Sequence, residues 1–407
     1  MASPHGFTVE EARARFIDGL VPLAAEDLPL RAAMGRILAQ PVLADRLVPD
    51  APRAAVDGWA IRAEASRGAS SGAPVRLRIT GSALAGHPAS AVLGPDEAMR
   101  ITTGGVLPEG ADAAEYQEVC RVEDGFLLLS RAVERGANVR AAGEDMRPGQ
   151  ELLPAGTAVR PAVTGLLAAL GQDRAFVRRR VRVRFVSTGD EIFPLGAPLP
   201  PGGTYDSNSI AIGARLEELG AEVDLRGPVQ DTPEAIAEVC KGGGFDMLIT
   251  SGGVSVGPKD LIGEVGRLLG ASVAFHWARM RPGAPTMGLR LPGGVPWLGL
   301  SGNPLSAQVG FDLFGRAAVA RLLAAPDSLL RTRARLTQAF RGKPPDAPRL
   351  LCASLSLQGG EIRADIHPYQ SSGGVRAMAQ TNGYVIQPEG VGALPGGELV
   401  DALWLSC

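Results

Sequence analysis

The chain has 407 residues, of which 45% are hydrophobic and 21% are charged, and its formal net charge is −2. This balance gives no electrostatic footprint for nucleic acid, and no apolar run reaches the roughly 18 residues of a membrane-spanning helix. The N-terminal sequence lacks the apolar core of a signal peptide, and the four cysteines favour a reducing, cytoplasmic location. A chain of this length is expected to fold as two to four domains.

In chain order, the first predicted element is a helix that begins at a capping box formed by Thr8 and Glu11 and runs to Leu20. Residues 44–147 are rich in turns and contain short alternating runs, a pattern typical of a β-rich insertion. Beyond Pro326 the alternating runs return and predict a small, all-β terminal domain.

Between these parts, residues 181–324 alternate strand-like and helix-like segments, which predicts a parallel sheet with helices on both faces. Three apolar runs each lead into a turn of small residues, at 187–191, 250–257 and 301–304. Backbone N–H groups in such strand–turn–helix units bind anions, although a glycine-rich turn can also mark only a tight connection. We therefore expect an anionic substrate to contact Ser251, Gly252, Gly253, Ser255, Gly257, Ser301, Gly302, Asn303 and Pro304.

Three acidic residues, Glu191, Asp231 and Asp260, each follow a different predicted strand at its carboxyl end. Ligands of such sheets bind at this edge, so the three side chains can converge there. Carboxylates beside a bound phosphate require a cation between them, and oxygen ligands favour Mg²⁺. Each acid has an alternative interpretation as a helix cap or a solvated loop residue, and for Asp231 both interpretations remain open.

Taken together, the motifs resemble those of the molybdopterin molybdenumtransferases, the family of MoeA and the gephyrin E domain. The likeness covers most of the chain in the family's order, and its motifs are AVDGWA (55–60), RITTGG (100–105), GED (143–145), STGDE (187–191), DTPEA (231–235), SGGVSVG (251–257), RPG (281–283) and GNPLSA (302–307). The resemblance implies four domains: an α/β molybdopterin-binding domain (1–20 and 179–326), a linking domain (21–43 and 148–178), a β-rich insertion (44–147) and a C-terminal β domain (327–407).

The resemblance also implies a reaction, in which molybdate is inserted into adenylyl-molybdopterin with the help of Mg²⁺ and AMP is released. Arg281 would bind substrate, and the catalytic residues would be Asp57, Thr103, Asp145, Glu191, Asp231 and Asp260. In this family the insertion reaches the cleft of the other subunit, so a homodimer is expected. Other proteins of molybdenum-cofactor biosynthesis are candidate partners.

Several positions depart from the family pattern. Where the family usually reads HKVAMKPGKP, this chain reads HWARMRPGAP at 276–285, so Trp277 and Ala284 replace two lysines suited to an oxyanion. Arg281 keeps one cation, and Ser301 replaces a proline. Loss of one charge-assisted contact to an anion typically costs about 1.5 to 3 kcal/mol.

Three hypotheses are therefore open. The first is an active molybdenumtransferase, which the retained acids favour. The second is an impaired member that binds the pterin nucleotide, or a partner, as a carrier or scaffold, which Trp277 and Ala284 favour. The third is an adenylyl-transferring relative, which the α/β region alone also resembles; the insertion and the terminal β domain argue against it.

Overall fold

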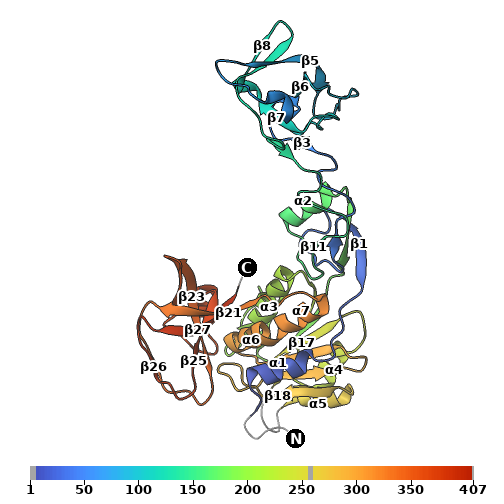
Figure 1. The fold of residues 1–407 in the computed structure, drawn as a ribbon. Coiled ribbons are helices and arrows are strands. Elements are labelled where there is room, and N and C mark those ends of the chain that lie inside the picture. The colour runs from blue at the N-terminus through green and yellow to red at the C-terminus, as the bar shows by residue number, and fades with distance from the viewer. Residues whose placement is uncertain (1–5, 255–259, 406–407) are drawn as a thin grey trace. The chain divides into compact units, whose positions relative to one another are not determined.

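The structure of the chain, a computed structural model, describes residues 6–254 and 260–405. The expected substrate ligands Ser255 and Gly257 lie outside the described residues. The chain forms two compact units (Figure 1): one comprises Met1–Gln40, Ala155–Gly165 and Asp173–Cys407, and the other comprises Pro41–Pro154 and Leu166–Gln172. The finer division into four domains stays a prediction.

A six-stranded sheet forms the centre of the larger unit. Its strands follow the order β16 (Glu222–Val229), β13 (Arg182–Thr188), β17 (Met247–Ser251), β20 (Pro296–Leu300), β19 (Met287–Arg290) and β18 (Ser272–His276). β13 pairs in parallel with β16 and β17, and β17 pairs in parallel with β20, as predicted, but β19 is antiparallel to both of its neighbours. The short connection from β19 to β20 accounts for this reversal, because only antiparallel neighbours can be joined by a tight turn.

Helices cover both faces of this sheet. One face packs against α1 (Val9–Ile17), α3 (Ser207–Glu218), α6 (Pro304–Gly310) and α7 (Arg316–Leu323), and the other against α4 (Pro233–Cys240) and α5 (Leu261–Leu268). Alternation along β17 explains the two cores, since Met247 and Ile249 point into the first and Leu248 into the second. The capping box at the start of α1 is present: Thr8 Oγ1 accepts a hydrogen bond from the Glu11 amide.

A closed barrel of five strands completes the larger unit. Its strands are β21 (Leu329–Leu336), β24 (Glu361–Ile366), β23 (Arg349–Gln358), β25 (Gly383–Gln387) and β27 (Leu399–Leu405). Leu350, Tyr384 and Leu403 from this barrel belong to the first core of the α/β domain, so the two parts share buried surface. The unit also contains β1 (Ala25–Pro29) paired with β12 (Arg174–Arg178), β14 (Ile192–Phe193) with β15 (Thr204–Tyr205), β22 (Phe340–Arg341) with β26 (Ala393–Leu394), and α8 (Val375–Ala379).

The smaller unit is built around a second six-stranded sheet. Its strands follow the order β7 (Ala113–Tyr116), β4 (Gly58–Ile61), β6 (Glu97–Ile101), β5 (Val75–Ala83), β9 (Phe126–Leu129) and β8 (Cys120–Glu123). The unit also contains two separate two-stranded sheets, β3 (Arg53–Ala54) with β10 (Val139–Arg140) and β2 (Val42–Leu43) with β11 (Glu151–Leu153). The division between the two units falls within α2 (Pro161–Ala169). The multidomain fold class, an α/β domain with a β-rich insertion and a terminal β domain, is confirmed. No helix among the described residues is long and apolar enough to cross a membrane.

Candidate functional site

The carboxyl ends of β13, β17 and β20 lie side by side, because Ser187 pairs in register with Ser251 and Ser251 with Leu300. The three predicted turns therefore meet at one edge of the sheet. Gly252 has φ of +103°, and a Cβ there would lie 2.2 Å from the carbonyl oxygen of Thr188. Only glycine fits this position, which brings the backbone of one turn against the end of the neighbouring strand.

Asn208, near the start of α3, links two of these turns and was not singled out from the sequence. Its Nδ2 donates hydrogen bonds of 2.8 Å to Ser251 Oγ and of 2.8 Å to the carbonyl oxygen of Gly302. Ser251 Oγ in turn donates to the carbonyl oxygen of Ser301 at 3.3 Å. The sequence offered one signal, since Asp206 two residues earlier is a helix N-cap and places Asn208 in the first turn of α3.

Asp231 is held at the strand edge and does not cap a helix. Thr188 Oγ1 donates a hydrogen bond of 2.6 Å to Asp231 Oδ1, while the N-cap of α4 is Thr232. The Asp231 amide donates to Asp190 Oδ1 at 3.3 Å, which places a second carboxylate beside it. Asp231 is therefore not the cap of α4, and its functional role stays a prediction.

The other two predicted acids differ from Asp231. Asp260 is the N-cap of α5, where its Oδ1 accepts a hydrogen bond of 3.1 Å from the Gly263 amide, as the helix-cap interpretation predicts. Glu191 follows β13 with an exposed side chain. Over residues 6–254 and 260–405, no three acidic, histidine or cysteine side chains form a group that could hold a metal. Asp231 and Asp190 together still fit Mg²⁺, which typically binds through one or two carboxylates and the phosphates of a substrate.

A pocket of about 460 Å³ lies against the turn that follows β20, and we call it the turn pocket. It is lined by Arg281, Ser301 and Asn303 from the α/β domain and by Lys343, Asp346, Arg349 and Ser372 from the C-terminal domain, among others. Asn303 caps α6 with Pro304 at its first turn, as predicted, and the Asn303 side chain makes no capping hydrogen bond. The cations at 343 and 349 were missed because they belong to a separate domain, where no local pattern marks them.

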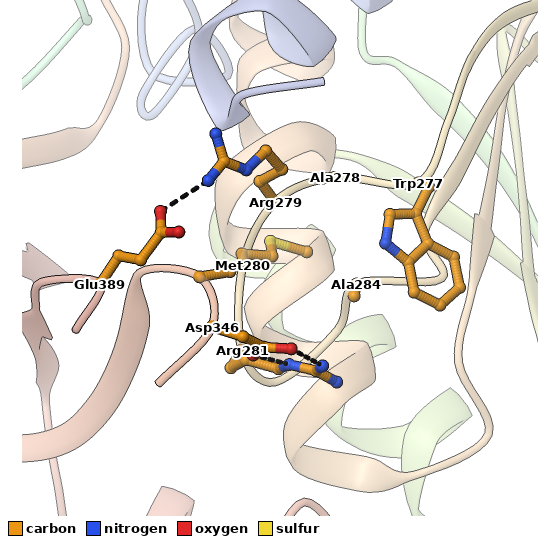
Figure 2. Close-up of a pocket in the computed structure, with 9 residues that line it drawn as sticks. Trp277, Ala278, Arg279, Met280, Arg281, Ala284, Asp346 and Glu389 are labelled. Carbon is orange, nitrogen blue, oxygen red and sulfur yellow. Dashed lines mark hydrogen bonds and ion pairs between the residues drawn. The ribbon is translucent and has the colours of Figure 1, made fainter. Parts of the chain in front are cut away.

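A second pocket of about 420 Å³, the tryptophan pocket, contains the positions that depart from the family pattern (Figure 2). It is lined by Trp277, Ala278, Arg279, Met280, Arg281, Ala284, Asp346, Ala347 and Glu389. Both of its arginines are paired with carboxylates of the C-terminal domain. Arg281 forms a two-pronged ion pair with Asp346, at 3.1 Å from Nε to Oδ1 and 2.7 Å from Nη2 to Oδ2, and Arg279 Nη2 lies 2.6 Å from Glu389 Oε2.

This pairing changes the electrostatics of Arg281. The hydrogen bonds that Arg281 donates to Asp346 raise the pKa of the Arg281 guanidinium, and the same bonds lower the pKa of the Asp346 carboxyl. Arg281 is therefore a cation, as predicted, but its charge is already balanced by a neighbouring carboxylate. Its role in substrate binding stays a prediction.

Three predicted residues lie in the smaller unit. Asp57 Oδ1 accepts hydrogen bonds from Thr103, at 2.7 Å from the amide and 3.0 Å from Oγ1, and the bond from the amide is the main reason that the pKa of Asp57 is lowered. Asp145 is exposed, and its amide donates to the carbonyl oxygen of Val48 at 3.0 Å. The structure thus brings Asp57 and Thr103 together as one polar pair.

The fold and the strand-edge turns define the class of protein. Residues 184–321 match the family described as a probable molybdopterin binding domain, residues 7–171 match the MoeA N-terminal region (domain I and II), and residues 333–405 match the MoeA C-terminal region (domain IV). A region that matches the probable molybdopterin binding domain thus stands between two MoeA-type regions.

Relatives identify the family. The chain is 35% identical over 388 residues to the molybdopterin molybdenumtransferase of Bacillus subtilis, covering 93% of this chain and 89% of that protein. It is 36% identical over 320 residues to the enzyme of the same name from Nostoc, covering 76% of this chain and 73% of that protein. The chain belongs to the molybdopterin molybdenumtransferase family, and it is a transferase of molybdenum-cofactor biosynthesis.

Solved structures agree with this assignment. A crystal structure of the molybdopterin biosynthesis moeA protein from Pyrococcus horikoshii matches with a TM-score of 0.85 and 30% identity, over 99% of this chain and 100% of that one. A crystal structure of a molybdopterin biosynthesis moeA protein from Pyrococcus horikoshii OT3 also gives a TM-score of 0.85, with 26% identity over 98% of this chain and 99% of that one.

Proposed function

We propose that the chain inserts molybdate into adenylyl-molybdopterin, with Mg²⁺ required and AMP released. The observation that carries this proposal is the meeting of three strand-end turns: Asn208 joins the second to the third, and Asp231 is bonded to Thr188 at the first. Such an edge offers backbone N–H groups for phosphate and a carboxylate for a cation within one site.

The chain's own residues would divide the work as follows. The backbone of the turns at Gly252 and Gly302 would hold the phosphates, with Asn208 keeping the two turns in register and Asn303 offering a free amide side chain. Thr188 orients Asp231 through the hydrogen bond to its Oδ1, which leaves the second carboxylate oxygen for other partners. Water would supply the oxygen that replaces the broken phosphoanhydride bond, and AMP would leave while molybdenum joins the two dithiolene sulfurs.

Asp231 and Asp190 would hold Mg²⁺ together with the phosphates of the substrate. Glu191 and Asp260, which form no metal-holding group with them among the described residues, would have to move to become further oxygen ligands. When bound, the ion supplies positive charge that polarises the phosphoryl oxygens and screens the two anionic substrates from one another. Asp260 would have to share its carboxylate with the cap of α5, where it uses Oδ1. We place the reaction in the cytoplasm. The described cysteines at 120, 240 and 352 are free thiols, which is typical of a reducing compartment.

We further propose that the active unit is a homodimer. Asp57, Thr103 and Asp145 belong to a separate compact unit, away in sequence from the strand-edge acids. In a dimer, this unit of one copy would complete the cleft of the other, with the Asp57 carboxylate and the Thr103 hydroxyl facing the substrates. Because the pKa of Asp57 is lowered, that group would act as a carboxylate at neutral pH.

The test is an insertion assay with purified protein, adenylyl-molybdopterin and molybdate. AMP release should require Mg²⁺ or Mn²⁺, should stop on chelation with EDTA, and should resume when Mg²⁺ is added in excess. Metal analysis of the purified protein should find no stoichiometric zinc. Insertion at full rate in EDTA, or a tightly held zinc ion, would contradict the metal assignment.

A second candidate function is supported by the two ion pairs of the tryptophan pocket. With Trp277 and Ala284 in place of lysines, and with both arginines paired, the pocket offers little free positive charge to an oxyanion. The chain would then bind the pterin nucleotide as a carrier or scaffold. Tight nucleotide binding without AMP release, at any molybdate concentration, would favour this second candidate.

A further inference from the structure

The tryptophan pocket has a feature that the proposed function does not explain. Its charged lining residues are two arginines and two carboxylates, so its formal charge is zero. The arginines come from the loop at 277–285 and the carboxylates from the C-terminal domain, which therefore neutralises the only cations that this loop presents to the pocket.

The Arg281–Asp346 pair lies between the tryptophan pocket and the turn pocket. Arg281, Ala284 and Asp346 line both the tryptophan pocket and the turn pocket, so this pair stands where the two meet. The turn pocket adds Lys343 and Arg349, which are further cations on the C-terminal side. An anion at the turn that follows β20 would therefore lie close to a guanidinium that is already bound to a carboxylate.

Both ion pairs are open to solvent. The side chains of Arg281 and Asp346 are 50% and 72% exposed, and those of Arg279 and Glu389 are 35% and 49% exposed. Exposed ion pairs are weak, because water screens them and each side chain loses rotamer freedom. A tetrahedral oxyanion can take the place of a carboxylate on an arginine fork, since both present oxygens at matching spacing.

The main chain around the loop is held on all sides, so this exchange needs only side chains to move. The amide of Arg281 donates to the carbonyl oxygen of Pro348 at 2.9 Å, and the amide of Leu350 donates to the carbonyl oxygen of Arg281 at 2.7 Å. Trp277 has φ of +73°, which is strained for a bulky residue, and its backbone bonds to Thr286 and Phe7, both 3.1 Å long, hold it there.

We propose that the carboxylates of Asp346 and Glu389 compete with oxyanions for Arg281 and Arg279, and that this competition sets the oxyanion affinity of the pocket. An incoming dianion must displace the carboxylates from Arg281 and Arg279, and the two displaced negative charges oppose its binding. The inference rests on the proposed function to the extent that the physiological anion is the molybdate of that reaction. Asp346 and Glu389 thus raise the oxyanion concentration that is needed to occupy the pocket.

The experiment measures molybdate binding directly, by equilibrium dialysis at constant ionic strength with molybdenum quantified in each chamber. The test variant is Asp346→Asn with Glu389→Gln, which keeps the shape of both side chains and removes both charges. We expect its dissociation constant for molybdate to fall at least about tenfold below that of the wild type. Arg281→Ala in the same background should abolish the gain.

The control variant is Glu361→Gln. Glu361 is also a carboxylate of the C-terminal domain paired with an arginine, at 2.8 Å from Arg335, but it lines neither pocket. Its removal should leave molybdate affinity unchanged. Circular dichroism melts of all variants check that they fold, and the exposure of the three carboxylates makes folding defects small.

An unchanged dissociation constant in the folded double variant would overturn the inference. An equal gain in Glu361→Gln would overturn it as well, because the effect would then reflect overall charge. A gain confined to the double variant supports the inference even if no variant releases AMP, and that combination would instead count against the proposed catalytic function.

Discussion

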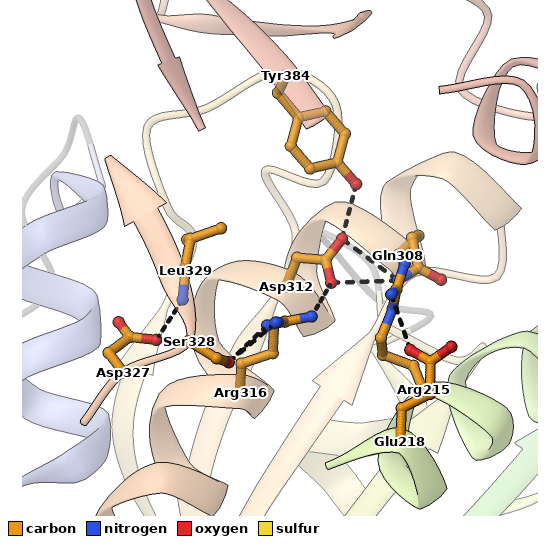
Figure 3. Close-up of polar contacts among 9 residues, drawn as sticks. All are labelled: Arg215, Glu218, Gln308, Asp312, Arg316, Asp327, Ser328, Leu329 and Tyr384. Atoms are coloured by element: carbon orange, nitrogen blue, oxygen red, sulfur yellow. Dashed lines mark hydrogen bonds and ion pairs between the residues drawn. The ribbon is translucent and has the colours of Figure 1, made fainter. Parts of the chain in front are cut away.

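Tyr384 on β25 of the barrel donates a hydrogen bond of 2.7 Å to Asp312, which lies in the π-helical turn η3 (Phe311–Gly315) between α6 and α7 (Figure 3). Both residues are buried, with 3% and 1% exposure. Gln308 Nε2 lies 3.3 Å from each Asp312 carboxylate oxygen, and Arg316 Nη1 lies 3.9 Å from Oδ1. A buried polar cluster thus joins the C-terminal barrel to the helices next to the turn pocket.

The first prediction concerns this link. Tyr384→Phe removes one donor from a buried carboxyl group, so the free energy of unfolding should fall by about 1 to 3 kcal/mol in urea titrations. Tyr205→Phe is the matched control, because Tyr205 donates to the carbonyl oxygen of Ala197 at 2.9 Å from an exposed position. The control should cost well under about 1 kcal/mol. Equal losses in both variants would mean that burial of the Asp312 cluster carries no extra stability.

The second prediction concerns pH. Burial raises the pKa of Asp312 above its ordinary value of 3.8, so the folded chain binds this proton more tightly than the unfolded chain. The resulting stability is complete below pH 3.8 and is lost as pH rises toward the folded-state pKa. Asp312→Asn cannot titrate, so the unfolding free energy of the wild type minus that of the variant should decrease from about pH 4 upward.

Urea titrations of both proteins across this range provide the measurement. Groups that titrate equally in both proteins cancel in the difference, and the ordinary pKa values of the neighbouring Arg316 and Tyr384 lie far above the range. A difference that stays constant with pH would show that Asp312 has the same pKa in the folded and unfolded chains, and would contradict the prediction.

The third prediction concerns Asn208. Replacement by Ala removes both hydrogen bonds between the turns, so binding of AMP, measured by calorimetry, should weaken by about tenfold. Asn382→Ala is the control: Asn382 also joins main-chain groups, accepting from the Leu355 amide at 2.7 Å and donating to its carbonyl oxygen at 3.0 Å, but in the barrel. The control should lose stability and keep its AMP affinity. If Asn208→Ala binds AMP normally, the turns are held in register by other contacts.

The fourth prediction tests the shared site. Asp57→Ala and Asp260→Ala should each be inactive alone, and their mixture should regain part of the activity, because a heterodimer would contain one intact site. The regained activity should rise with the fraction of heterodimer, which tagged copies can report. Demonstrated exchange of subunits without any recovery would place both residues in the same site of one copy.

The fifth prediction restores the missing cations. Trp277→Lys with Ala284→Lys should lower the molybdate concentration for half-maximal insertion by about tenfold and change pterin-nucleotide affinity much less. The control adds the same charge elsewhere, as Val273→Lys with Leu268→Lys, since both positions are 58% exposed and lie outside the pocket. If the wild type already saturates at low molybdate, the tryptophan pocket was never impaired.

Much of the strand-edge site could be predicted from the sequence because it is local. Small residues that follow apolar runs predict the turns after β13, β17 and β20, and Asn303 with Pro304 predicts the start of α6. The register of the sheet then brings the turns together. The side-chain roles of Asp231 and Asp260 were not decided by sequence, since both precede helices and only the structure separates the Thr188 partner from the α5 cap.

The contacts that escaped prediction connect distant parts of the chain. Asp346 and Glu389 meet the loop at 277–285 only because the barrel docks beside it, and Tyr384 reaches Asp312 for the same reason. No periodicity or motif encodes such pairs, because each partner alone looks like an ordinary surface acid or a core tyrosine. The antiparallel orientation of β19 could not be predicted either, because a short apolar run in the sequence does not indicate in which direction the strand runs within the sheet.

The packing of α1 has a consequence for synthesis of the protein on the ribosome. Phe16 of this first helix is fully buried and meets Phe275 edge to face, with ring centroids 6.0 Å apart. Its partner emerges about 260 residues later, which at roughly 5 to 20 residues per second is on the order of ten to fifty seconds. Throughout that interval the helix has an apolar face without its partner, while the intervening insertion has already been made. The apolar face of α1 is therefore exposed to aggregation during synthesis until the strand that carries Phe275 has been made.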